Sequence, residues 1–283
     1  MQIDSVGVIG AGTMGNGIAQ ICAMAGLDVV MLDISEAATE RGMAALGNSL
    51  DRLIKKEKLD EAGKQAVLGR VRATTDRQAM ADVDLVIEAA TEAEDLKVKV
   101  LADICSVLKP EAMIASNTSS ISITKLAAAT DRPDRFIGMH FFNPVPMMQL
   151  VELIRGLQTG DETQSAALAF AERIGKTAIS ARNSAGFAVN RILVPMINEA
   201  VFVLQEGLAS AEDIDTGMKL GCSHPIGPLA LADLIGLDTL LAVMEVFYTS
   251  FNDSKYRPAP LLREMVEAGY LGRKSGRGFY SYS

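Results

Sequence analysis

The sequence contains no tryptophan, and it has only two histidines and three cysteines among its 283 residues. The two histidines lie far apart in the sequence, which disfavours a zinc site, and the odd number of cysteines has no metal-type spacing. Each cysteine has apolar neighbours, so we expect all three to be reduced core residues in a cytoplasmic protein. We therefore expect no metal centre and no disulfide framework.

Long apolar runs and an excess of basic residues are also missing. No uninterrupted apolar stretch reaches the roughly 20 residues that a membrane-spanning helix needs, and residues 1–4 lead into an apolar strand and not into a signal peptide. The net charge of -8 argues against nucleic acid as the main partner, because phosphate backbones are bound through an excess of Lys and Arg. The 49% hydrophobic content predicts a substantial core.

Glycine is plentiful, and three glycines stand in a pattern with chemical meaning. Gly10, Gly12 and Gly15 follow an apolar strand-like run and open a stretch with helical spacing, and a second apolar strand then ends in Asp33. This order is the context in which the glycine fingerprint predicts a dinucleotide site. The first glycine permits a tight turn, the second lets a pyrophosphate approach the backbone, and the third lets helix and strand pack closely.

The cofactor that this site predicts is NAD. Asp33 is placed to accept hydrogen bonds from the ribose hydroxyls, its charge would repel a 2′-phosphate, and no arginine follows it directly. The glycine motif alone leaves FAD open as an alternative.

Strand-like runs and helical patterns alternate up to about residue 180, and after residue 184 only helical patterns follow. Such alternation predicts a Rossmann-type α/β domain with a doubly wound sheet, and the later pattern predicts an all-α C-terminal domain. We place the domains at residues 1–183 and 184–283, with a cleft between them. Residues 35–54 are expected to form a long helix with a charged continuation through residues 52–64. Residues 187–208 and 229–251 are expected to be helical. The first of these is apolar almost all round, so it must be buried either inside its own domain or against another subunit, and we expect the helical domain to dimerise.

The segment from Met139 to Leu153 carries the strongest sign of catalysis. His140 and Glu152 lie symmetrically about Pro146, between two apolar strand-like runs. If the Asn143–Pro146 centre is a turn, the two side chains face each other across a hairpin. A carboxylate that holds one imidazole nitrogen fixes the tautomer and raises the basicity that general acid–base catalysis needs. The alternative is a buried structural histidine with a solvent-exposed glutamate.

Polar residues also stand at the ends of two other predicted strands. Glu92 follows one strand, and Ser119 and Ser120 follow another. In an open parallel sheet, ligands bind beyond the carboxyl ends of the strands. For the two serines, capping of the helix expected at residues 121–128 is the competing interpretation, and one could cap while the other binds.

These motifs resemble the 3-hydroxyacyl-CoA dehydrogenases, and more narrowly the stand-alone bacterial 3-hydroxybutyryl-CoA dehydrogenases. The resemblance spans nearly the whole chain, and its most specific part is the His-Phe-Phe-Asn-Pro motif together with a later Asn-Arg motif. The motifs that carry it are the glycine fingerprint, residues 116–120, 140–146, 150–152, 183–191, 224–229, 236–238 and 276–280.

The resemblance implies roles for particular residues. It implies that His140 is the catalytic base, that Glu152 orients it, and that Ser119 and Asn190 hydrogen-bond the substrate, with Asn190 supplied by the helical domain. Ser49 and Lys56 match, less securely than the others, family positions that hold the CoA moiety. The residues that it and the fingerprint assign to the cofactor are Gly10, Gly12, Thr13, Met14, Gly15, Asp33, Glu92, Lys97, Ser119 and Asn143.

The function that the resemblance implies is an NAD-dependent L-3-hydroxyacyl-CoA dehydrogenase for short chains such as 3-hydroxybutyryl-CoA and acetoacetyl-CoA. It implies fatty acid or butanoate metabolism, with a homodimer formed through the C-terminal domain. Two alternatives are a dehydrogenase of a free 3-hydroxy acid and a binding protein that lost its chemistry, like the lens crystallins. The presence of His140, Glu152 and Ser119 argues against the second alternative.

Overall fold

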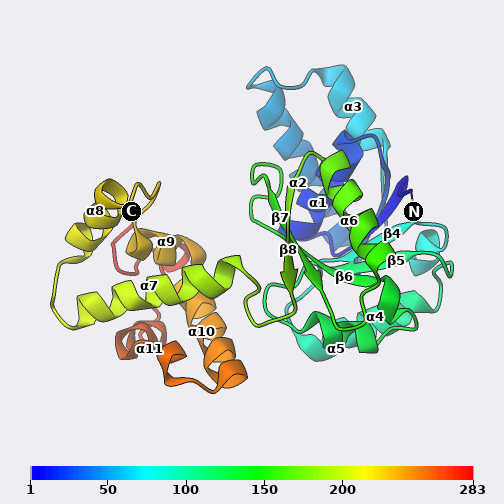
Figure 1. Ribbon diagram of the computed structural model, residues 1–283. Coiled ribbons are helices and arrows are strands. Elements are labelled where there is room, and N and C mark those ends of the chain that lie inside the picture. Colours follow the sequence, from blue (N-terminus) through cyan, green and yellow to red (C-terminus); the bar gives the residue numbers. More distant parts are fainter. Residues whose placement is uncertain (1, 283) are drawn as a thin grey trace. The chain divides into compact units, whose positions relative to one another are not determined.

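The computed structural model describes residues 2–282 and divides into two compact units, Met1–Ser184 and Ala185–Ser283. The first unit is an eight-stranded sheet with flanking helices, and the second is built from helices (Figure 1). The strands are β1 (Ser5–Ile9), β2 (Asp28–Leu32), β3 (Val71–Thr74), β4 (Leu85–Glu88), β5 (Met113–Ser116), β6 (Phe136–Phe141), β7 (Leu150–Arg155) and β8 (Thr177–Arg182). The helices of this unit are α1 (Thr13–Met24), α2 (Glu36–Ile54), α3 (Glu61–Gly69), α4 (Glu94–Cys105), α5 (Ile123–Ala128) and α6 (Asp161–Arg173).

The strand order is β3-β2-β1-β4-β5-β6-β7-β8. Strands β1 to β6 run parallel, β7 is antiparallel to β6, and β8 is parallel to β7. The order reverses at β1, which places the ends of β1 and β4 at the switch point where open α/β sheets bind ligands. The predicted Rossmann-type sheet is therefore confirmed.

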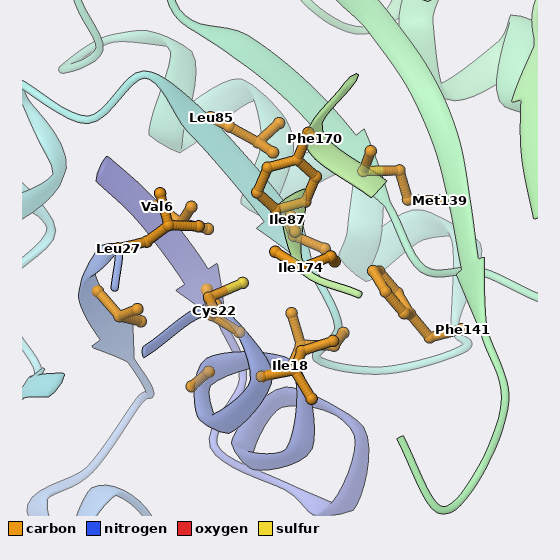
Figure 2. Packing of buried hydrophobic residues seen from close by; sticks show 14 of the residues in the cluster. Val6, Ile18, Cys22, Leu27, Leu85, Ile87, Met139, Phe141, Phe170 and Ile174 are labelled. Carbon is orange, nitrogen blue, oxygen red and sulfur yellow. The ribbon is translucent and has the colours of Figure 1, made fainter. Parts of the chain in front are cut away.

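Alternate residues of the strands face opposite layers, because successive side chains in a strand point to opposite faces. Met139 and Phe141 of β6 belong to a core that also contains Ile18 of α1 and Phe170 of α6 (Figure 2). Between them, His140 points to the other face, where a Cβ on Gly138 would stand 2.8 Å from the Ile123 side chain of α5. Because Met139 and Phe141 pack against the apolar layer of α1 and α6, His140 between them faces the opposite side of the sheet.

The second unit packs its helices around a core of its own, which includes Ile197, Leu229, Met244 and Phe247. Its helices are α7 (Val189–Gln205), α8 (Ala211–Gly221), α9 (Pro228–Ile235), α10 (Leu237–Phe251) and α11 (Pro260–Glu267). This confirms the predicted helical region. Across residues 2–282, the structure contains no helix with the length and apolarity needed to cross a membrane.

Two of the expected helices differ from the structure. The charged continuation of the helix expected at residues 35–54 does not form, because the chain turns after Ile54 with Glu57 at a φ of 55° before α3 begins. Ser35 is the N-cap of α2, and its side chain accepts a hydrogen bond from the Ala38 N–H. The helix expected at residues 229–251 is divided at Gly236, whose φ of 102° is unsuited to a helix interior.

One expectation about burial is wrong, and one helix is shorter than expected. Cys22 and Cys105 are buried as expected, but Cys222 is exposed, because it follows the end of α8 in a turn. The apolar helix expected at residues 187–208 begins at Val189, and Ile192 on it is 72% exposed. An apolar neighbourhood in the sequence therefore does not guarantee burial within this chain.

Candidate active site

A histidine–carboxylate pair stands on the hairpin formed by β6 and β7. The antiparallel register places His140 directly opposite Glu152, and Nδ1 of His140 lies 2.7 Å from Oε2 of Glu152. The His140 side chain is 8% exposed and that of Glu152 is completely buried. This contact confirms the predicted hairpin pairing and contradicts a solvent-exposed Glu152. In such a buried setting, a charge-assisted hydrogen bond fixes which imidazole nitrogen faces the carboxylate.

The loop between the two strands is held by contacts with Lys176 and with α1. Nζ of Lys176, beside β8, donates to the carbonyl oxygens of Val145 and Met148 at 2.6 Å each. Val145 is also buried against α1, where a Cβ on Gly17 would stand only 2.9 Å away. Burial lowers the pKa of Lys176 from its usual range. These contacts hold the loop that carries Asn143, and they were not foreseen because no local signal links Lys176 to it.

Ser119 lies in a cluster of donors around one carboxylate oxygen. Oε1 of Glu92 is 3.0 Å from Oγ of Ser119 and 3.1 Å from Oγ of Ser120, and it also accepts from the Thr118 hydroxyl at 2.7 Å. Burial by itself would raise the pKa of Glu92, but the Lys97 ammonium and these hydrogen bonds outweigh it and hold the pKa below its usual range. Glu92 is therefore ionised at neutral pH.

The interpretation of Ser119 and Ser120 as helix caps is wrong. Helix α5 begins at Ile123, and its N-cap is Ser122, whose hydroxyl accepts from the Lys125 N–H. Nearby, the Asn117 side chain accepts a hydrogen bond from the Phe141 N–H at 2.9 Å. This bond ties the strand end next to His140 to the loop that carries Ser119.

A buried ion pair lies beneath this cluster. Nζ of Lys97 lies 2.9 and 2.6 Å from the two oxygens of Glu88, and the two side chains are 2% and 0% exposed. The Ser116 hydroxyl and the Ala90 N–H complete the hydrogen bonding of Glu88. Lys97 also stands 3.7 Å from Glu92. Glu88 was not assigned a role from the sequence, although a carboxylate at the end of an apolar strand signals a buried partner.

The glycine loop has the geometry that a dinucleotide pyrophosphate requires. Gly10 has a φ of 98°, and a Cβ on Gly15 would lie 1.7 Å from the Gly10 carbonyl oxygen. At Gly12 a Cβ would meet nothing within 4 Å, so the backbone is open to an approaching group. Within residues 2–282, no side chain caps the first turn of α1, which begins at Thr13 and Met14. Its N–H groups are available for an anion, so these residues fit NAD.

Asp33 lies beside the glycine loop. Its Oδ2 accepts a hydrogen bond from the Ala11 N–H at 2.7 Å, and its Oδ1 accepts one from the Ile34 N–H at the same distance. The carboxylate also lines a cavity of about 200 Å³ together with Gly10. This is the position from which a carboxylate can accept hydrogen bonds from an adenosine ribose.

A larger cavity of about 830 Å³ lies between α1, α2, the β6–β7 loop and the turn before β8. Ser49, Lys56 and Asn143, which the sequence assigned to ligands, all line it. Its further cationic side chains are Arg52, Lys58, Arg173 and Lys176, and none of its lining residues in the described chain is an Asp or Glu. The cavity is therefore a basic pocket in an acidic protein, which suits a ligand with several phosphates.

Asn190 lies in the second unit, near the start of α7, and is half-buried. Its contribution to the substrate site stays a prediction.

Comparison with known proteins identifies the family. The model of the 3-hydroxyacyl-CoA dehydrogenase NAD-binding domain matches residues 5–184, and that of the 3-hydroxyacyl-CoA dehydrogenase C-terminal domain matches residues 186–282. The chain belongs to the 3-hydroxyacyl-CoA dehydrogenase family. This confirms the resemblance, and an NAD-dependent oxidoreductase is the class of enzyme that the family supports.

Relatives in this family match the chain over nearly its whole length. A 3-hydroxybutyryl-CoA dehydrogenase from Bradyrhizobium diazoefficiens is 55% identical over 99% of this chain and 96% of the relative. The crystal structure of (S)-3-hydroxybutyryl-CoA dehydrogenase PaaH1 from Ralstonia eutropha is 66% identical, with a TM-score of 0.98 and full coverage of both chains. A diketoreductase that acts on dicarbonyl compounds is more distant, at 30% identity and a TM-score of 0.87, again with full coverage of both chains.

Proposed function

We propose that this dehydrogenase interconverts short-chain L-3-hydroxyacyl-CoA and 3-ketoacyl-CoA, such as 3-hydroxybutyryl-CoA and acetoacetyl-CoA, with NAD as the cofactor. The observation that carries the proposal is the buried contact of 2.7 Å between Nδ1 of His140 and Oε2 of Glu152, near the carboxyl end of β6. The names of the relatives at 55% and 66% identity support the substrate class.

His140 is the general base in this proposal. Because Glu152 holds Nδ1, Nε2 exchanges the proton with the 3-hydroxyl of the substrate. A bound nicotinamide would accept the hydride that leaves C3. Glu152 fixes the imidazole tautomer and stabilises the imidazolium that forms when the proton arrives. Its complete burial strengthens this interaction, since the local dielectric constant is low.

Ser119 and Asn190 orient the substrate oxygen in the same proposal. The Ser119 hydroxyl shares Oε1 of Glu92 with other donors, while one carboxylate oxygen offers only about two lone-pair sites. Ser119 can therefore turn toward a substrate without leaving Glu92 unsatisfied. Thr13, Met14, Glu92, Lys97 and Asn143 are proposed to contact the cofactor, as the resemblance implies.

Comparison of acetoacetyl-CoA with free acetoacetate in an NADH-oxidation assay tests the proposed activity. We expect rapid oxidation with the thioester and little with the free acid, because the basic pocket would hold the CoA phosphates. Equal rates with both substrates would favour an enzyme for free ketoacids. No rate with either would favour a silent binding protein.

The pocket also predicts which lysine matters for CoA. Lys56 lines the basic pocket whereas its neighbour Lys55 does not, although both are exposed. We expect Lys56→Ala to raise KM for acetoacetyl-CoA about tenfold through the loss of a charge-assisted contact, with kcat unchanged. Steady-state kinetics measure both constants, and Lys55→Ala is the matched control.

The short thioester acetoacetyl-N-acetylcysteamine separates this effect from a general disturbance, because it lacks the CoA phosphates. KM for this thioester should be the same in Lys56→Ala and in the unmodified enzyme. An equal rise of KM for both thioesters would show that Lys56 does not act on the phosphates.

We further propose that the protein is a cytoplasmic homodimer that associates through the helical unit. Large apolar side chains on that unit are exposed, among them Ile192 at 72%, Leu208 at 76% and Leu220 at 81%. Sedimentation equilibrium should give twice the chain mass of 30.1 kDa, and a monomer mass at micromolar concentration would contradict the dimer.

A further inference from the structure

The cavity beside Asp33 is lined by an arginine, Arg77, that was not assigned a role from the sequence. This cavity of about 200 Å³ is lined by Asp33 and Ile34 after β2, by Thr75 and Arg77 after β3, and by Asp103 among the residues of α4. If NAD binds as proposed, the cavity is the adenosine end of its site. The inference drawn from it rests on that proposal.

The sheet brings these two chain segments together. Strands β2 and β3 are parallel neighbours with Leu32 paired to Thr74, and the Asp33 N–H donates to the Thr74 carbonyl oxygen at 3.2 Å. The residues that follow the two strands therefore lie side by side. Arg77 is the first residue of the short 3-10 helix Arg77–Met80, which starts from this edge and is capped by Asp76.

The two charged groups differ in how firmly they are held. Both oxygens of Asp33 accept backbone hydrogen bonds, from Ala11 and from Ile34, so its carboxylate is fixed against the glycine loop. Arg77 is exposed, and in the described chain it forms no ion pair or side-chain hydrogen bond. Asp76 beside it accepts from the Gln78 N–H. Arg77 is thus a cation on the cavity wall without a partner of its own.

We propose that Arg77 is a second determinant of the choice between NAD and NADP, acting on the same ribose position as Asp33. The Asp33 carboxylate repels a 2′-phosphate on the adenosine ribose. Arg77 lines the same cavity and binds that phosphate once the charge of Asp33 is removed, because guanidinium groups bind phosphate through several donors at once. Asp103 also lines the cavity and limits the gain, but it belongs to α4 and not to the strand ends that flank Asp33.

Asp33→Asn removes the charge with little change in shape. The amide oxygen of Asn can still accept the hydrogen bond from the Ala11 N–H that anchors the glycine loop, while the Ile34 N–H loses its acceptor. We measure dissociation constants of NADH and NADPH from the fluorescence of their own reduced nicotinamide, without acyl-CoA substrate. We expect Asp33→Asn to bind NADPH at least about tenfold more tightly than the unmodified enzyme does, since a repulsion is removed.

A second substitution in the Asp33→Asn background tests Arg77. We expect Asp33→Asn/Arg77→Met to lose most of the gain in NADPH affinity and Asp33→Asn/Arg77→Lys to keep part of it, with NADH affinity changed little in either. Arg72→Met in the same background is the matched control, because Arg72 is an exposed arginine of β3 that does not line the cavity.

Each outcome bears on the proposal. Equal NADPH affinity in Asp33→Asn and Asp33→Asn/Arg77→Met, or an equal loss with Arg72→Met, would overturn the role of Arg77. No gain of NADPH affinity in Asp33→Asn while NADH still binds would overturn the role of the Asp33 charge. Failure of the unmodified protein to bind NADH would instead overturn the proposed function, and thermal unfolding of each variant separates a lost fold from a lost contact.

Discussion

His140→Gln is expected to lower kcat for acetoacetyl-CoA reduction by about 10²- to 10⁴-fold, the range that a positioned acid–base group contributes. The amide of Gln keeps a donor for the buried Glu152 carboxylate, which lies 2.7 Å from Nδ1 in the native protein. It cannot exchange a proton with the substrate at neutral pH. The loss should therefore fall on the chemical step and not on the fold.

The measurements are kcat from steady-state NADH oxidation and the dissociation constant of NADH from its fluorescence. NADH affinity should be retained, because no residue of the glycine loop or the Asp33 cavity is altered. His224→Gln is the matched control, since the second histidine lies in the turn between α8 and α9 of the helical unit. A His140→Gln enzyme with full kcat would remove His140 from the role of base.

Local patterns predicted those parts of the site that depend on strand geometry. His140 and Glu152 stand at equal distances from Pro146 between two apolar runs, and residues so placed in a hairpin lie opposite each other on the same face. The glycines of the loop follow a steric rule, since a Cβ on Gly15 would stand only 1.7 Å from the Gly10 carbonyl oxygen. Such rules act within a few residues and are visible in one sequence.

The parts that were missed depend on partners far apart in the chain. Arg77 lines the same cavity as Asp33 only because β3 pairs with β2, and Lys176 reaches the hairpin loop only because β8 is placed beside β7. Ser119 and Ser120 matched Ser122 by residue type, but α5 begins at Ile123 with Ser122 as its cap, and the hydroxyls of Ser119 and Ser120 bond Glu92 instead. Competition between local and distant partners is decided by the tertiary structure and not by propensity.

Glu152→Gln should lower kcat by about 10²-fold or more while leaving KM and NADH affinity nearly unchanged. A Gln amide occupies the same volume in the fully buried position, but it is neutral and can present a donor to Nδ1. It then favours the imidazole tautomer with the proton on Nε2, and it no longer stabilises the imidazolium. Steady-state kinetics give kcat and KM, and thermal unfolding checks that the variant is folded.

The double variant His140→Gln/Glu152→Gln decides whether Glu152 acts through His140. Two groups that work as a unit show strongly non-additive losses, so the double variant should be about as slow as His140→Gln alone. If the two losses multiply instead, Glu152 contributes independently of the imidazole, through packing or through another contact. That result would reduce the buried pair to a structural feature, even though the 2.7 Å contact between Nδ1 and Oε2 is present.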